Sequence, residues 1–135
     1  MSEREYDLVV VGAGPAGSSA AYAAAKNGIK VALLEKEENV AQTVRTSGVT
    51  WIDYAKEFGI PEDCYNPIRT YNFCSPKNKV SISDEHAKAA VLDVRKTYRF
   101  LADLAKKNGA EIFVNTNVTK TITENGKVVG VKASS

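Results

Sequence analysis

Three glycines and one glutamate carry the clearest chemical signal in this sequence. Gly12, Gly14 and Gly17 directly follow an apolar run of valines, and Glu35 closes a second apolar run. A strand, a glycine turn, a helix and a second strand that ends in a carboxylate form the order that binds the ADP half of a dinucleotide. The pattern therefore predicts a nucleotide site.

Each of these residues has a physical reason for its type. Gly12 permits a tight turn, Gly14 lets a pyrophosphate approach the backbone, and Gly17 lets the helix pack close to the strand. The helix N-terminus adds N–H groups and a partial positive charge. Glu35 lies 18 residues after Gly17, near the usual spacing of about 20. Its carboxylate can accept both ribose hydroxyls and would repel the 2′-phosphate of NADP. The alternative interpretation is a glycine-rich turn with an ordinary surface glutamate.

The elements that must position these residues alternate in type. Apolar runs predict strands at 6–11, 29–35 and 111–114, the first of them buried, and helical periodicity predicts helices at 16–26 and 93–107. This alternation is typical of an α/β fold with a parallel sheet and helices on its faces.

The remaining segments give weaker patterns. Residues 36–50 are polar and poorly periodic, which indicates a loop, and short strands are expected at 68–74 and 79–82. Asn125-Gly126 between two alternating segments predicts a β-hairpin. A helix is expected at 51–58, with one apolar face made of Trp51, Tyr54, Ala55 and Phe58.

Composition excludes several function classes. With 18 basic and 16 acidic residues, a net charge of +2 and scattered basic side chains, the chain has no nucleic-acid footprint. Cys64, Cys74 and His86 form no metal-ligand spacing, so both cysteines are expected to be buried free thiols and the histidine a solvated loop residue. A charged N-terminus and the lack of a long apolar run predict a cytoplasmic protein.

Four blocks of the sequence together resemble a known family. They are the glycine turn, Leu34-Glu35-Lys36, the segment 91–95 and the segment 101–112, in that order. They resemble the N-terminal part of FAD-dependent oxidoreductases of the para-hydroxybenzoate hydroxylase type. Within that group the chain is most similar to the geranylgeranyl reductase family, whose members saturate isoprenoid double bonds in archaeal membrane lipids or chlorophyll precursors.

The resemblance implies a Rossmann-like FAD/NAD(P)-binding parallel sheet with an appended small β-hairpin. It covers essentially all of this chain but only the N-terminal part of a full-length family member. Residues 1–135 would therefore be the N-terminal part of an FAD-binding domain, and the domain would be incomplete. The substrate domain and a later Gly-Asp motif of the family are absent from this sequence.

The resemblance also implies roles for individual residues. The pyrophosphate of FAD would be held by the turn residues Gly12, Ala13, Gly14, Pro15, Ala16 and Gly17, with backbone donors from Ala13 to Ala16. Glu35 would bind the adenosine ribose. Further cofactor contacts would come from Lys36, Arg45, Ser47, Gly48, Arg95 and Val118, the last through backbone atoms near the adenine. Ser47 departs from the family, which usually has a cysteine before this glycine.

Several interpretations of function remain open. The first is an FAD-dependent reductase of isoprenoid lipids, with NAD(P)H as a candidate reductant and the membrane as a candidate peripheral contact. The second is a flavin-dependent monooxygenase, and an NAD-binding domain is a third. The fourth is a non-catalytic nucleotide-binding fragment that needs a partner chain. An exposed sheet edge is expected where the next strand is absent, and it would favour self-association. No side chain is assigned a catalytic role, and whether the chain is an enzyme by itself stays open.

Overall fold

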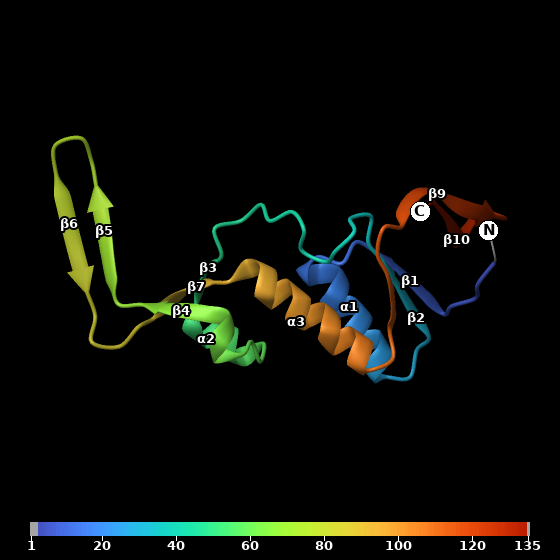
Figure 1. Ribbon diagram of the computed structural model, residues 1–135, viewed down its shortest axis with the longest axis horizontal. Coiled ribbons are helices and arrows are strands. Elements are labelled where there is room, and N and C mark those ends of the chain that lie inside the picture. The colour runs from blue at the N-terminus through green and yellow to red at the C-terminus, as the bar shows by residue number, and fades with distance from the viewer. Residues whose placement is uncertain (1–2, 135) are drawn as a thin grey trace. The chain divides into compact units, whose positions relative to one another are not determined.

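The computed structural model describes residues 3–134, which fall into two compact units (Figure 1). The first unit contains the residues up to Val44 and those from Tyr98 onward, and the second contains Arg45–Thr97. The glycine turn and Glu35 belong to the first unit.

A parallel sheet forms the centre of the first unit, as predicted. It contains β1 (Leu8–Val11), β2 (Val31–Leu34) and β8 (Glu111–Phe113), in the order β1-β2-β8. The central strand β2 is buried at all four positions. Because the strands are parallel, the carboxyl ends of β1 and β2 lie at the same edge of the sheet, where the glycine turn begins.

Two helices pack against this sheet through small side chains, mostly alanines. The helix α1 (Pro15–Lys26) follows the glycine turn, and α3 (Val94–Lys107) continues from the second unit into the first. Small side chains let a helix lie close to a sheet, so the core of this unit combines alanines with two larger residues of β2. Its buried members are Ala13, Ala21, Ala25, Val31, Leu33, Ala105 and Ala110.

The predicted C-terminal hairpin is confirmed. Strands β9 (Asn117–Glu124) and β10 (Lys127–Ser134) pair antiparallel, with irregular register at two points along β10. Asn125 and Gly126 have φ angles of 49° and 77°. Two successive positive φ angles are typical of the type I′ turn that joins a tight hairpin.

The second unit contains an antiparallel sheet that the sequence patterns did not predict. Its strands are β3 (Val49–Trp51), β7 (Ala89–Leu92) and β4 (Tyr65–Ile68), in the order β3-β7-β4. The same unit contains the short helix α2 (Ile52–Glu57) and the 3-10 helix η1 (Glu62–Cys64). Strands of three or four residues are too short to show alternation, which explains why β3 and β7 were missed.

The helix in this unit was predicted to have one apolar face, and this prediction is wrong for the three aromatic residues, which do not pack in the core. The helix α2 buries Ile52 and Ala55, whereas Trp51, Tyr54 and Phe58 are 57%, 54% and 71% exposed. Spacing along a helix identifies residues on one face, but packing decides which face meets the core.

A second hairpin extends from this unit (Figure 1). Strands β5 (Thr70–Cys74) and β6 (Lys79–Ser83) pair antiparallel, close to the predicted positions. Phe73 lies opposite Val80, and both side chains are exposed. Cys74 is also exposed, so the prediction of two buried thiols is right for Cys64 and wrong for Cys74.

The strand β1 also departs from prediction in its burial. Leu8 and Val11 are 37% and 56% exposed, although an apolar parallel strand is usually buried. The reason is its place in the sheet: within the described part of the chain, β1 is a terminal strand that pairs with β2 alone. Within residues 3–134, no helix is long and apolar enough to cross a membrane, and no three His, Cys, Asp or Glu side chains form a candidate metal site.

Candidate nucleotide-binding site

The glycine turn has the backbone geometry that its sequence predicts. Gly12 has a φ of +94°, and its N–H donates to the Leu34 carbonyl oxygen at 2.7 Å. A side chain at Gly17 would bring its Cβ to 1.9 Å from the Gly12 carbonyl oxygen. By contrast, a Cβ at Gly14 would have no neighbour within 4 Å among the residues that the structure describes. The backbone at Gly14 is therefore open to a ligand.

The start of α1 completes an anion-binding surface. Gly14 is its N-cap and Pro15 occupies the first turn, and no side chain among residues 3–134 caps the helix. Uncapped N–H groups at a helix N-terminus attract phosphate oxygens. Ser18, which the motif did not single out, is fully buried, and its hydroxyl donates to the Ala13 carbonyl at 3.2 Å. In the sequence, the one signal for this contact with the turn is the position of Ser18 directly after the glycine motif.

Glu35 lies within hydrogen-bond distance of the turn. Its Oε2 accepts the Ala13 N–H at 2.8 Å, and its Oε1 accepts the Glu37 N–H at 3.0 Å. The side chain is half-buried. The tertiary structure thus brings together the turn and the carboxylate that the sequence separates by 22 residues.

This contact revises the expected set of phosphate donors. The Ala13 N–H is bonded to Glu35, and Pro15 has no N–H to donate. Of the expected backbone donors Ala13 to Ala16, this leaves the N–H groups of Gly14 and Ala16, whose contact with a phosphate remains a prediction.

Two other predicted residues of the first unit lie outside the turn. Lys36 is exposed, with its Nζ 4.0 Å from Glu37 Oε1. Val118 is half-buried in β9, opposite Ala133. Their suggested contacts with a cofactor remain predictions.

The remaining predicted residues belong to the second unit. Arg45 and Ser47 are exposed in the segment before β3, and Arg95 is exposed in the first turn of α3. Gly48 is buried with a φ of +76°, and a Cβ there would lie 2.8 Å from the Leu92 carbonyl oxygen. Gly48 therefore serves the packing of its own unit, and cofactor contacts of these residues remain predictions.

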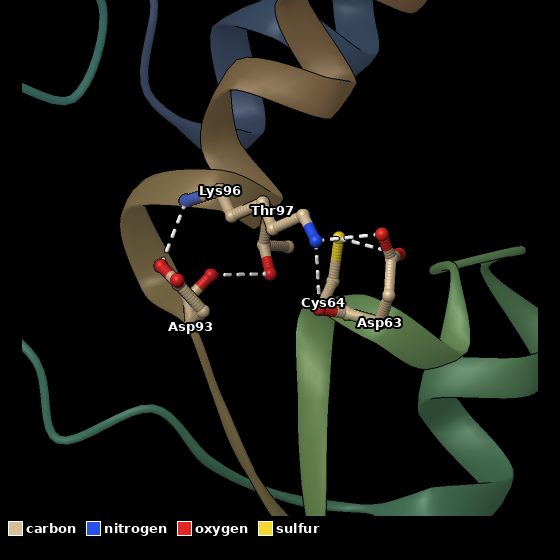
Figure 2. A network of polar contacts seen from close by, with 5 residues as sticks. All are labelled: Asp63, Cys64, Asp93, Lys96 and Thr97. Carbon is tan, nitrogen blue, oxygen red and sulfur yellow. Dashed lines mark hydrogen bonds and ion pairs between the residues drawn. The ribbon is translucent and has the colours of Figure 1, made fainter.

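A polar network at the start of α3 was not predicted (Figure 2). Lys96 Nζ lies 2.6 Å from Asp63 Oδ2 and donates to the Asp63 carbonyl at 3.0 Å. Asp93 caps the helix by accepting the Lys96 N–H at 2.9 Å. The hydrogen bond from Lys96 lowers the pKa of Asp63, and burial raises the pKa of the neighbouring Cys64 thiol.

Comparison with known proteins identifies the family. The model of the family described as FAD dependent oxidoreductase matches residues 7–135. This chain belongs to the FAD-dependent oxidoreductase family. The matched range contains the glycine turn, Glu35 and both hairpins.

Individual relatives agree with this assignment. The chain is 40% identical to the digeranylgeranylglycerophospholipid reductase of Methanocaldococcus jannaschii over 115 residues, which are 82% of this chain and 29% of that protein. It is 39% identical to the enzyme of the same name from Methanocella arvoryzae, over 94% of this chain and 34% of that protein.

A solved structure also resembles the fold. The geranylgeranyl bacteriochlorophyll reductase-like protein of Thermoplasma acidophilum matches 95% of this chain with a TM-score of 0.83 and 33% identity. This chain corresponds to 34% of that protein. It therefore spans about a third of the length of these relatives.

Proposed function

We propose that this chain binds the ADP half of FAD at the glycine turn and Glu35. The observation that carries the proposal is the open backbone at Gly14, beside an uncapped helix start and within reach of a carboxylate. A pyrophosphate fits beside a glycine that lacks neighbours, and the N–H groups of the helix start would neutralise its charge.

Glu35 supplies the ribose contact in this proposal. A carboxylate has about four acceptor positions, and backbone N–H groups use one on each Glu35 oxygen. The remaining positions can accept the 2′- and 3′-hydroxyls of the adenosine ribose. A 2′-phosphate would meet a like charge at this point, so a nucleotide without that phosphate is preferred.

Because the relatives are about three times as long as this chain, we also propose a role for it within a longer protein. In this proposal the chain is the FAD-binding part of a reductase of isoprenoid lipid double bonds. The support is that relatives 39% and 40% identical to this chain are named digeranylgeranylglycerophospholipid reductases. Bound FAD would supply the hydride chemistry. The residues of this chain would hold its ADP half. Arg45, Ser47, Gly48 and Arg95 are the candidates for further contacts.

The first test is the visible spectrum of FAD during titration with the purified chain, with ADP as competitor. A shift of the flavin bands that ADP reverses supports the proposal. The Gly14→Ala variant is expected to fold normally, because its Cβ meets no neighbour. It should lose at least about tenfold in affinity, since the methyl group occupies the pyrophosphate position.

Gly130→Ala is the matched control. Gly130 lies in β10 without a positive φ, and a Cβ there would make only an ordinary contact, 3.5 Å from Ile122. This variant should bind FAD and ADP like the unchanged chain. If the unchanged chain binds neither nucleotide, or if Gly14→Ala binds as tightly as Gly130→Ala, the proposed site is wrong.

A further inference from the structure

We infer that Glu35 is also a positioning residue, which holds the glycine turn in its ligand-binding conformation before any nucleotide arrives. This inference rests on the proposed function, since it concerns the same site. It goes beyond ribose recognition because it gives the carboxylate a role towards the protein's own backbone. The affinity of a ligand without ribose hydroxyls would therefore still depend on Glu35.

The side-chain contacts of Glu35 carry the inference. One carboxylate oxygen accepts the N–H of Ala13, in the middle of the turn, at 2.8 Å. The other accepts the N–H of Glu37, in the loop after β2, at 3.0 Å. The carboxylate therefore joins two loops that follow neighbouring parallel strands.

The backbone of Glu35 is itself fixed. Its N–H donates to the Phe113 carbonyl at 2.8 Å, and its carbonyl accepts the Thr116 N–H at 2.8 Å. Because β8 and the segment after it hold both backbone groups, the carboxylate extends from a rigid point of the sheet. A rigid support is what allows one side chain to define the position of a turn.

The turn needs such an anchor. Gly12 and Gly14 flank Ala13, and glycine has the greatest backbone freedom of all residues. Ala13 is 1% exposed, so loss of the carboxylate would leave a sheltered N–H without its partner, at a cost comparable to a lost hydrogen bond. The turn would then sample conformations in which Gly14 and the start of α1 no longer face one phosphate position.

The test uses 2′,3′-dideoxy-ADP, which keeps the pyrophosphate but lacks both ribose hydroxyls. Affinities are measured by calorimetry for the Glu35→Gln and Glu35→Ala variants of the full chain. Both variants are neutral, so the loss of negative charge near the phosphates cancels in the comparison. Glutamine retains an oxygen for the Ala13 N–H, so Glu35→Gln is expected to bind about fivefold more tightly than Glu35→Ala. Equal affinities would overturn the inference.

A ligand-free measurement separates this inference from the proposed function. Amide exchange of Ala13 should be at least about fivefold faster in Glu35→Ala than in the unchanged chain, with the β2 amides unaffected. Glu38→Ala removes an exposed carboxylate nearby and should leave this rate unchanged. If no nucleotide binds at all, the proposed function fails and the exchange rate alone decides: an unchanged rate at Ala13 in Glu35→Ala overturns the positioning role.

Discussion

Gly14 and Gly17 are both small residues of one turn, but for different physical reasons. At Gly17 the obstacle to a side chain is the protein itself, because a Cβ would lie 1.9 Å from the Gly12 carbonyl oxygen. At Gly14 there is open space, so the requirement for glycine comes from the proposed ligand. A substitution at Gly17 is therefore expected to change the stability of the fold, and a substitution at Gly14 the affinity for the ligand.

Gly17→Ala tests the stability side. The added methyl group must displace the backbone of Gly12, whose N–H is bonded to the Leu34 carbonyl in the folded chain. We therefore expect a loss of about 2–3 kcal/mol in the free energy of unfolding. Urea denaturation monitored by circular dichroism measures it. Gly130→Ala, whose Cβ makes an ordinary contact, should lie within about 1 kcal/mol of the unchanged chain. An equally stable Gly17→Ala variant would contradict the close approach.

The two thiols should differ sharply in reactivity. Cys74 is exposed, whereas Cys64 is 2% exposed and burial raises the pKa of its thiol. Since the thiolate is the reactive form, a disulfide reagent such as DTNB should modify one thiol rapidly in the native chain and the second only after unfolding. Cys74→Ser should remove the rapid phase. A rapid phase that survives in this variant would contradict the burial of Cys64.

At the scale of elements, the start of α3 depends on polar contacts rather than on apolar spacing alone. Asp93 caps the helix, and Lys96 in the first turn pairs with Asp63, which lies in η1. Both side chains of this pair are largely solvent-accessible, at 47% and 69%. Exposed ion pairs contribute little to stability and are screened by salt.

This pair predicts a defined pH dependence. The pKa of Asp63 is lowered and that of Lys96 is raised in the folded chain. The contribution to stability is therefore present at neutral pH, is lost as the pH falls through the lowered pKa of Asp63, and is lost as the pH rises through the raised pKa of Lys96. Asp63→Asn should lower Tm at pH 7 by a few degrees at most.

Thermal unfolding against pH and salt checks this prediction. The difference in Tm between Asp63→Asn and the unchanged chain should disappear at a pH below the Asp63 pKa. It should also shrink in high salt. A difference that persists under both conditions would show that the substitution acts through packing instead of charge.

At the scale of the whole molecule, the strand β1 leaves one sheet edge uncovered. It is a terminal strand of the β1-β2-β8 sheet, and Leu8 and Val11 on it are exposed. An apolar terminal strand offers unpaired N–H and carbonyl groups to another strand. We propose that this edge makes the chain self-associate in solution.

Sedimentation velocity over a range of concentrations tests this association. Leu8→Lys places a charge on the edge strand and should shift the population towards monomer, because charged residues oppose edge pairing. Tyr54→Lys, at a 54% exposed position of the helix α2 in the second unit, is the control and should leave the association unchanged, because it lies on no sheet edge. A strictly monomeric chain, or equal effects of the two variants, would refute pairing through β1.

Local signals explain which parts of the structure were predictable. The glycine turn, the acid after the second strand and Asn125-Gly126 each encode their conformation within a few residues, so the parallel sheet and the C-terminal hairpin were predicted. The β3-β7-β4 sheet was missed because its strands are too short to show a period. The exposure of Trp51 and Phe58 was missed because spacing does not reveal which helix face packs.

The sequence by itself determined the fold class and the family of this protein: an α/β chain similar to FAD-dependent oxidoreductases. It also predicted a ribose contact for the glutamate that follows the second strand. Only the tertiary structure showed which backbone groups of the protein this glutamate contacts. Glu35 and Ala13 meet because parallel strands bring their carboxyl ends to one edge of the sheet. A contact between residues that far apart depends on strand order and register, which a local pattern does not contain.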